Sequence, residues 1–351
     1  MRRHLATSRA WLGVLLKDLP RYLPALVRND SAYLALCNRN ERLQAAPDGS
    51  GYRCDWRWTA DLHAPKLMPW LGRWLMQRAL QDHPVRMQSA PTQTELAPQV
   101  SFIIGHRGDA RLPLLLKTVQ SIAGQQGVAI ECIVVEQDTE SRIAEQLPDW
   151  VQHIHTPPPS ADMPYCRSWA FNVGAKHAHG ELLVLHDNDM LVPIDYAALS
   201  LQRMREGSEL INLKRFICYL DTDRTEALCR GQAGLIECPP EVIMQNAEGG
   251  GSIVIARDAF ERIGGMDESF IGWGGEDNEF WERAQTLKVW PYGCLPLVHL
   301  WHAAQPGKQS QENPTLTLLR TKMGVSPLAR IEQLKAMGSG ADSGPSGWKG
   351  Q

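Results

Sequence analysis

The sequence predicts an α/β fold built on a doubly wound sheet of parallel strands, and three observations support this. Continuous apolar runs at 100–104, 131–137 and 181–189 are rich in aliphatic and β-branched residues, as expected of strands buried on both faces. A segment with helical periodicity follows the first run, and a helix-like segment at 165–179 precedes the third. Polar side chains gather at the carboxyl end of each run. In such a sheet these ends meet at one edge, where ligands bind.

A weaker pattern continues beyond residue 206. INLKRFICYL at 211–220 and SIVIA at 252–256 are predicted strands, and RDAFERI at 257–263 is a predicted short helix that two glycines close. GWGGEDNEF at 272–280 is a glycine-rich loop that leads into a helix with an acidic first turn. These segments extend the alternation of strands and helices.

We expect three regions along the chain. Residues 1–98 form a helical N-terminal extension with a linker, residues 99–330 form the main domain, and residues 331–351 form a flexible tail that is rich in Gly and Ser. Within the first region we expect short amphipathic helices, such as 8–18 and 66–80, which a loop rich in Gly, Pro and Asp interrupts at 47–51. The linker is expected at 86–98.

Composition and charge exclude several classes of protein. With 43% hydrophobic and 21% charged residues, the chain has the composition of a soluble globular protein. Residues 1–98 hold 14 Lys and Arg against 8 Asp and Glu, and the rest hold 22 against 31. The acidic body argues against nucleic-acid binding. The basic front contains five tryptophans: Trp11, Trp56, Trp58, Trp70 and Trp74. We favour a helical appendage that docks on the main domain, and the alternative is peripheral contact with an anionic membrane.

No run of apolar residues is long enough to span a bilayer, and no signal peptide is evident. The eight cysteines form no CxxC pair, which favours reduced thiols and no structural zinc. We therefore expect a cytoplasmic protein, with the inner face of the membrane as its alternative place.

A candidate metal site follows the third strand. Asp187 and Asp189 end a buried run in ELLVLHDND, where carboxylate oxygens suit Mg²⁺ or Mn²⁺ bound to a diphosphate. His299 and His302 form HLWH after the apolar stretch CLPLV. Imidazole nitrogen is a better ligand for Mn²⁺ than for Mg²⁺, so the two segments together favour Mn²⁺.

The glycine-rich loop carries a second constellation. Trp273 is flanked by glycines, and Glu276 and Asp277 lie where a helix begins. An exposed Trp can stack on a sugar ring, and a neighbouring carboxylate can accept the proton of an attacking hydroxyl group. An acidic helix cap alone accounts for Asp277 but not for the whole WGGED cluster.

Together these residues resemble the GT-A glycosyltransferases over roughly residues 100–320. Within them the sequence is most similar to the β-1,4-galactosyltransferase and chondroitin-synthase type, of families 7 and 2, with WGGED as the specific element. The resemblance implies a Rossmann-like, doubly wound mixed sheet. It also implies that Trp273, Glu276 and Asp277 bind the acceptor sugar and that Asp277 is the base.

Further segments are similar to motifs of that type. The turn at 105–107 resembles its PFR segment, without the Pro and Phe; VVEQD resembles its second nucleotide segment; and RSWAFNVG resembles RxxxxNVG, whose arginine meets the diphosphate. GGGSIVIARDAFERIGGMDESF matches its GGVS stretch. The donor-binding residues that these likenesses imply are His106, Arg107, Glu136, Asp138, Arg167, Asp187 and Gly250.

The metal ligands are also implied by resemblance. LHDNDMLVP is similar to the DVD segment of that type, which makes Asp189 the main carboxylate ligand. The MxxH motif appears as HLWH, so its histidine falls on His302, and His299 replaces a thioether. Ala247 stands where the animal enzymes place an aromatic residue that limits the C2 substituent of the donor, so an N-acetylated donor is admitted.

The sequence therefore predicts an inverting glycosyltransferase that uses Mn²⁺, with Mg²⁺ as the alternative metal. It would move a hexose or N-acetylhexosamine, galactose-type favoured, from a UDP-sugar to a hydroxyl of a glycan or glycoconjugate. Asp187 and His299 would support the metal held by Asp189 and His302. Two other classes fit the same strands: a metal-dependent nucleotidyltransferase, which needs a basic glycine-rich loop after the first strand, and a non-catalytic sugar-binding protein.

Overall fold

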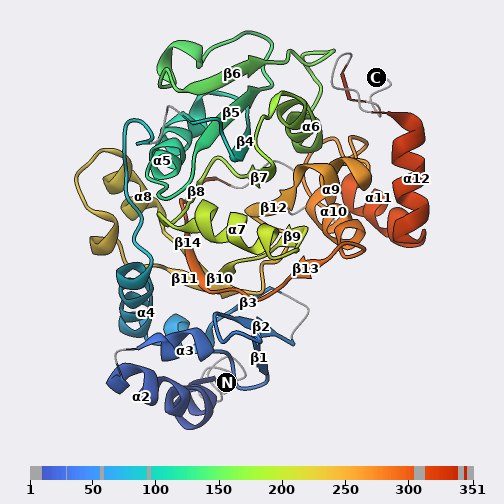
Figure 1. Cartoon of the computed structure of the whole chain (residues 1–351). Helices are drawn as coiled ribbons and strands as arrows, with labels where there is room; N and C mark the ends of the chain where they lie inside the picture. Colours follow the sequence, from blue (N-terminus) through green and yellow to red (C-terminus); the bar gives the residue numbers. More distant parts are fainter. Residues whose placement is uncertain are drawn as a thin grey trace.

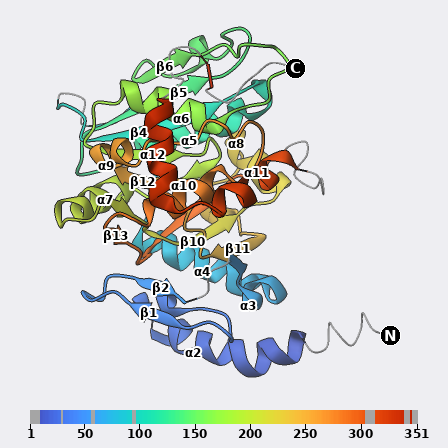
Figure 2. The same cartoon turned by 90° about the vertical axis from the view of Figure 1, so that its right-hand side faces the viewer.

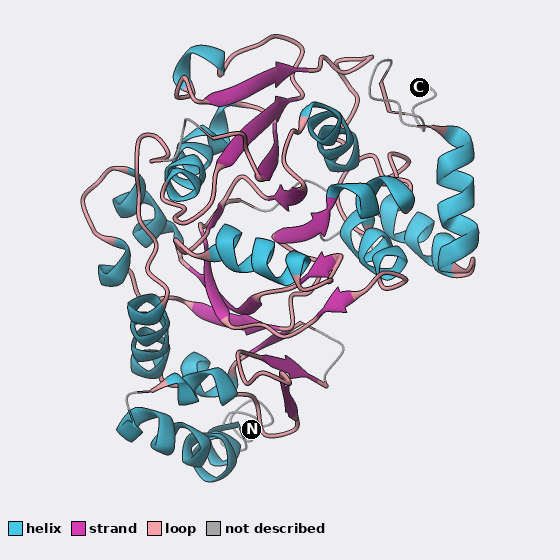
Figure 3. Cartoon of the chain, in the orientation of Figure 1, coloured by secondary structure: helices cyan, strands magenta, loops and turns pink. Residues whose placement is uncertain are grey.

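Two β-sheets form the centre of the fold, with helices around them (Figures 1 and 3). The computed structural model describes residues 10–28, 30–55, 59–92, 96–303, 313–338 and 344–345. Trp56 and Trp58, the start of the helix expected at 8–18, and most of the last 13 residues lie outside this part of the chain.

The larger sheet has seven strands in the order β13-β9-β12-β7-β4-β5-β6. They are β4 (Val100–His106), β5 (Ile130–Glu136), β6 (Val151–His155), β7 (Leu182–His186), β9 (Leu210–Ile211), β12 (Ser252–Ala256) and β13 (Val289–Trp290). Strands β7, β4, β5 and β6 are parallel, whereas β12 is antiparallel to both of its neighbours. The predicted mixed, doubly wound α/β sheet is therefore confirmed.

Helices cover both faces of this sheet. Helices α5 (Leu112–Ala123) and α7 (Tyr196–Arg205) cover one face, and α6 (Arg167–His177), α9 (Arg257–Arg262) and α10 (Glu276–Ala284) cover the other. Helix α8 (Thr222–Cys229) packs beside α5, and α11 (Pro314–Met323) and α12 (Pro327–Met337) pack against α10. Alternate residues of β4 point to opposite sides: Phe102 packs with α5 and α7, and Ile103 packs with α6, α9 and α10. A Cβ on Gly174 of α6 would lie 2.2 Å from Cγ2 of Ile103, so glycine permits this close packing.

Strand β6 is absent from the sequence prediction. It lies at the edge of the sheet, and only its first residue is fully buried. VQHIH therefore lacks the continuous apolar run by which the central strands were found, because an edge strand does not bury both faces.

The smaller sheet has five strands in the order β3-β11-β10-β14-β8. They are β3 (Ala60–Asp61), β8 (Met190–Leu191), β10 (Lys214–Tyr219), β11 (Val242–Gln245) and β14 (Leu295–His299). The strand predicted at 211–220 is in fact two strands: β9 ends in the larger sheet at Ile211, and β10 begins in the smaller sheet at Lys214.

The N-terminal region is mainly helical, as expected, and it also contains three short strands. Its elements are η1 (Val14–Asp18), α2 (Leu19–Arg28), η2 (Ser31–Ala35), β1 (Leu43–Ala45), β2 (Tyr52–Cys54), β3, α3 (His63–Leu67) and α4 (Pro69–Asp82). The loop expected at 47–51 joins β1 and β2. Strand β3 pairs with β11, and Leu71 and Leu75 of α4 share a core with Phe216 and Val298. The region thus completes the smaller sheet, and the boundary near residue 98 stays a prediction.

Of the segments labelled η, η1 is a π-helical turn and η2 is a 3₁₀ helix, as are η3 (Asp109–Arg111), η4 (Ala144–Gln146) and η5 (Leu235–Glu237). All eight cysteines are free thiols. Within the described ranges, no helix combines the length and the apolar character that a membrane crossing requires.

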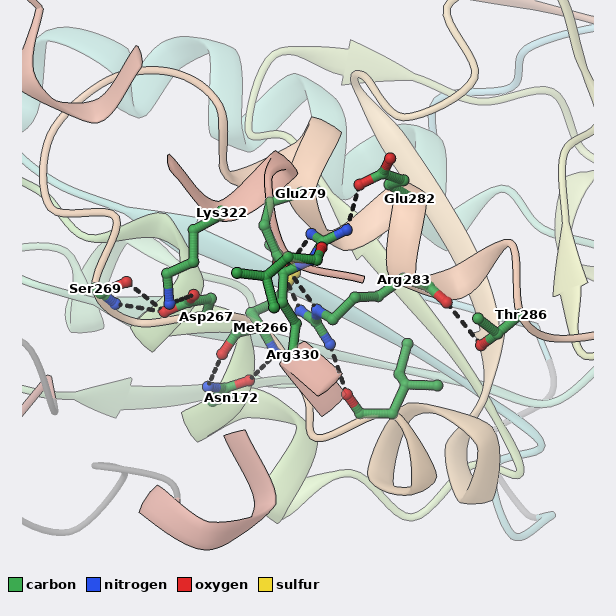
Figure 4. Close-up of polar contacts among 12 residues, drawn as sticks. Asn172, Met266, Asp267, Ser269, Glu279, Glu282, Arg283, Thr286, Lys322 and Arg330 are labelled. Carbon is green, nitrogen blue, oxygen red and sulfur yellow. Dashed lines mark hydrogen bonds and ion pairs between the residues drawn. The ribbon is translucent and has the colours of Figure 1, made fainter. Parts of the chain in front are cut away.

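A buried ionic network fixes α10 against the C-terminal helices (Figure 4). Arg283 donates to Glu279 over 2.7 Å, and Arg330 of α12 donates to the same carboxylate over 2.8 Å. All three side chains are fully buried, and Arg330 also pairs with Glu282, so two carboxylates balance the two guanidinium groups. Residues 331–337, expected to belong to a flexible tail, continue α12 because Ile331 and Leu334 are buried with Arg330.

Candidate active site

A cavity of about 540 Å³ opens at the carboxyl ends of β4 and β7. Its walls come from five segments: the turn after β4, the segment that leads into α6, the turn after β7, the loop that leads into α10, and the end of β14 with the residues after it. The predicted site residues that line it are Arg107, Arg167, Asp187, Asp189, Trp273, Glu276, Asp277, His299 and His302.

Asp189, His299 and His302 bring their ligand atoms within 4.8 Å of one another. Nε2 of His302 lies 3.3 Å from Oδ2 of Asp189, and Nε2 of His299 lies 3.7 Å from Oδ1. The backbone explains the meeting. Strand β14 pairs with β8 so that His299 lies opposite Met190, and the N–H of Leu300 donates to the carbonyl of Asp189 over 2.8 Å.

The chemistry of this triad suits a divalent metal ion. Oδ1 of Asp189 is buried and makes no hydrogen bond within the described part of the chain. Burial lowers the pKa of His299, which keeps the imidazole neutral and able to offer a lone pair. One carboxylate and two imidazoles form a mixed oxygen and nitrogen set, which favours Mn²⁺ over Mg²⁺.

Arg167 joins two acidic groups of the cavity. Its Nη2 lies 2.6 Å from Oδ1 of Asp187, and its Nη1 lies 3.4 Å from Oε1 of Glu276. Because β7 ends at His186, Asp187 and Asp189 lie in a turn. Both carboxylates line the cavity from this turn.

The glycines around Trp273 allow a backbone that other residues rarely adopt. Gly272, Gly274 and Gly275 have φ angles of 102°, 101° and 96°. The carbonyl oxygen of Trp273 accepts hydrogen bonds from the side chains of Asn313, at 2.9 Å, and Thr315, at 2.5 Å. The start of α11 therefore holds this loop, and the indole lies on the cavity wall with 38% of its surface exposed.

Glu276 and Asp277 begin α10 and have perturbed carboxyl groups. Burial raises the pKa of Glu276 to about 7, and the charge of Asp277 acts in the same direction against the opposing effect of Arg167. Burial also raises the pKa of Asp277, again against Arg167. A carboxylate with a raised pKa is a better proton acceptor at neutral pH, which is what a general base requires.

We expect Glu276→Gln to stabilise the metal-free protein more at pH 8 than at pH 5. The pKa of this carboxyl group rises from 4.5 to about 7 on folding, so the folded state loses stability as the pH rises through that interval. Since one pKa unit corresponds to about 1.36 kcal/mol, the gain in free energy of unfolding at pH 8 should be on the order of 1–3 kcal/mol. Urea unfolding at both pH values measures it, with the exposed Glu261→Gln as control. An equal effect at the two pH values would contradict the burial of this charge.

Arg111 lies beside the metal-ligand triad and is absent from the sequence prediction. Its Nη1 is 3.2 Å from Oδ2 of Asp189, and its Nη2 is 2.9 Å from Nδ1 of His302. The GHRGDAR turn contains two arginines, and only Arg107 matches the PFR likeness. Arg111 lies at the end of η3, several residues after β4 ends. Because η3 changes the direction of the chain, the position of Arg111 in the sequence did not indicate its contact with Asp189.

We expect Arg111→Ala to tighten Mn²⁺ binding by the nucleotide-free protein about tenfold, because it removes a positive charge next to a metal ligand. Titration followed by electron paramagnetic resonance of free Mn²⁺ measures the affinity. Arg142→Ala, which removes an exposed arginine paired with Asp109, is the matched control. Weaker Mn²⁺ binding by Arg111→Ala would mean that the guanidinium instead holds Asp189 in its binding position.

Two predicted donor-binding residues are buried behind the cavity. His106 is fully buried at the end of β4, with Nδ1 3.1 Å from Nδ2 of Asn188. Glu136, at the end of β5, accepts a hydrogen bond from the backbone N–H of Arg142 over 3.0 Å and lies 2.8 Å from Nε2 of His153. His106 thus supports the turn after β7 and Glu136 the turn after β5, and direct contact with a nucleotide stays a prediction.

Two further predicted residues, Asp138 and Gly250, are not among the side chains and backbone atoms that line the cavity. Asp138 accepts a hydrogen bond from the N–H of Thr139 over 2.8 Å, after the end of β5. Gly250 lies in the loop before β12, where a Cβ would come within 4.0 Å of Oδ2 of Asp277. Arg107 does line the cavity, and its Nη1 donates to the carbonyl of Met163 over 2.6 Å.

Comparison with known proteins assigns a family to this arrangement. The family described as "Glycosyltransferase like family 2" matches residues 101–290, which is more than half of the chain. These residues include β4 from its second residue, the turn after β7 and the start of α10, but not His299 and His302. No curated protein sequence gives a significant match.

Several solved structures are similar. The catalytic domain of Drosophila β1,4-galactosyltransferase 7 in complex with xylobiose has 14% identity and a TM-score of 0.35, covering 63% of this chain and 79% of that one. GalNAc-T7 with UDP, GalNAc and Mn²⁺ has 16% identity and a TM-score of 0.46, covering 66% and 48%. The mannosyltransferase PcManGT from Pyrobaculum calidifontis, in complex with GDP-Man and Mn²⁺, has 16% identity and a TM-score of 0.39, covering 78% and 82%.

Proposed function

The chain belongs to the family described as Glycosyltransferase like family 2, and we propose that it is an inverting, Mn²⁺-dependent member. It transfers a hexose or N-acetylhexosamine, galactose-type favoured, from a UDP-sugar to a hydroxyl of a glycan or glycoconjugate. The observation that carries this proposal is one cavity with two chemical groups: the triad of Asp189, His299 and His302, and the raised-pKa pair of Glu276 and Asp277.

The triad is the proposed metal site. Asp189 and His302 hold the ion, with His299 next to them and Asp187 in support. A bound Mn²⁺ supplies Lewis-acid stabilisation of the diphosphate leaving group. Arg107 and Arg167 on the same walls supply further positive charge for the phosphates, and an arginine fork suits phosphate oxygens.

The acidic pair is the proposed acceptor side. Asp277 accepts the proton of the acceptor hydroxyl group. At the same time the oxygen of that hydroxyl forms the new bond to the anomeric carbon, and the bond from the anomeric carbon to the diphosphate breaks. Oδ1 of Asp277 accepts a hydrogen bond from the N–H of Asn278 over 2.8 Å, whereas Glu276 is held by Arg167. This difference favours Asp277 as the base and Glu276 as the residue that orients the acceptor. Trp273 offers its indole to a sugar face.

Family membership favours this function over a nucleotidyltransferase. In addition, the reaction of a nucleotidyltransferase would not use the acidic pair next to Trp273. A non-catalytic sugar-binding protein would likewise have no need for two carboxyl groups with raised pKa values beside a metal-ligand triad. The transferase is therefore the function that we carry forward.

Slow hydrolysis of the donor tests the stereochemistry without knowledge of the acceptor. With Mn²⁺ and each of a panel of UDP-α-sugars, water takes the place of the acceptor hydroxyl, and early proton NMR spectra identify the released anomer. We expect the β anomer from one preferred donor and no release after addition of EDTA. Release of the α anomer would contradict the single-displacement mechanism.

A further inference from the structure

The N-terminal helical segment exposes an apolar surface. In residues 10–28, the buried side chains are Val14, Asp18, Tyr22 and Ala25, which face the rest of the protein. The opposite side, which we call the leucine face, consists of large apolar side chains that are all exposed: Trp11, Leu12, Leu15, Leu16, Leu23 and Val27.

The exposure of the leucine face is large. Leu16 has 72% and Val27 has 83% of its surface accessible. A surface helix of a globular protein normally buries its apolar stripe and turns polar residues outward. Here the outward side is mostly apolar, and an exposed cluster of this kind marks an interaction surface.

The charges around the leucine face favour an anionic partner. Lys17 and Arg28 are exposed, whereas the one acidic residue of the segment, Asp18, is buried and pairs with Arg39 at 2.9 Å. Arg21 turns inward and donates to the carbonyl of Asn38 over 2.7 Å. The sequence before residue 10 adds three arginines and no acidic residue.

We propose that the leucine face docks on the surface of an anionic lipid bilayer. Apolar side chains enter the boundary between headgroups and acyl chains, and the cations at the same surface pair with anionic headgroups. Leucines dominate the leucine face, and Trp11 adds one exposed indole.

The position of α2 suits such contact. Figures 1 and 2 both place α2 at the end of the molecule opposite β6. A bilayer can therefore meet the leucine face without contact with the larger sheet. The contact requires no change in the cavity, so it stands independently of the proposed glycosyl transfer.

Sedimentation with lipid vesicles tests this proposal. The full chain should co-sediment with vesicles of phosphatidylcholine mixed with phosphatidylglycerol, less with phosphatidylcholine alone, and less at high salt. The double variant Leu16→Glu and Leu23→Glu should weaken partitioning by at least about tenfold. Both leucines are exposed, so the fold should remain intact, which circular dichroism checks.

Leu328→Glu is the matched control, because Leu328 lies on α12 with 66% exposure and should leave partitioning unchanged. No binding of the wild-type chain to either vesicle would overturn the proposal, as would equal loss in the control. If ultracentrifugation instead finds a dimer that the double variant abolishes, without lipid binding, the occupant is a second copy of the chain.

Discussion

Asp277→Asn should slow glycosyl transfer by about 10²–10⁴-fold, which is the range that a positioned general base contributes. The amide keeps the size of the side chain and its hydrogen-bonding capacity but cannot accept the acceptor's proton at neutral pH. Affinity for the UDP-sugar should change little, because this residue is assigned to the acceptor side. Single-turnover hydrolysis or transfer, with donor affinity from calorimetry, separates the two effects.

Asn278→Ala is the control for this substitution, since Asn278 follows Asp277 on α10, is exposed and does not line the cavity. It should retain the wild-type rate. If Asp277→Asn keeps its rate while Glu276→Gln loses it, the base is Glu276. Unaffected rates in both variants would remove the acidic pair from catalysis.

Asp189→Ala should abolish tight Mn²⁺ binding and lower the rate of transfer by about 10³-fold or more, because a Lewis acid supplies several kcal/mol to a reaction with an anionic leaving group. Asp189 is the anionic member of the triad, and its removal also leaves the positive charge of Arg111 uncompensated beside the two histidines. Mn²⁺ titration by electron paramagnetic resonance and the rate with added Mn²⁺ measure both effects.

The exposed Asp149→Ala removes a carboxylate far from the triad in sequence and should leave Mn²⁺ affinity unchanged. Asp189→Ala with wild-type Mn²⁺ affinity would place the metal elsewhere. A variant that loses Mn²⁺ affinity but keeps its rate would show that transfer needs no metal at this site.

Central strands and their turns could be predicted from the sequence because their signals are local. Strands β4 and β7 are buried on both faces, so their sequences contain the apolar stretches VSFII and LLVL, and the polar turn after each marks the sheet edge. Edge strand β6 was not predicted, because it is only partly buried and lacks a continuous apolar run. The division of 211–220 between β9 and β10 was not predicted either, because nothing in the sequence pattern marks the change of sheet. The helix at 331–337 was read as tail since its buried residues, Ile331 and Leu334, are few.

Residues of the candidate site could be predicted where they lie close together in one sequence motif, as Trp273, Glu276 and Asp277 do. Contacts between distant segments could not. Arg111 reaches Asp189 only because η3 redirects the chain after β4, and His106 turns inward to Asn188 instead of lining the cavity. The directions in which the side chains of Arg111 and His106 point cannot be predicted from the spacing of residues in a turn. They depend on how neighbouring strands align in the sheet.

The most direct test is thermal unfolding of the purified protein with a panel of UDP-sugars, with and without Mn²⁺. We expect one UDP-sugar to raise the melting temperature in the presence of Mn²⁺, through binding to the folded state alone, and to have little effect without the metal. Asp189→Ala should lose this protection. If no nucleotide sugar protects the protein with either Mn²⁺ or Mg²⁺, the proposed donor and the proposed metal site are both wrong.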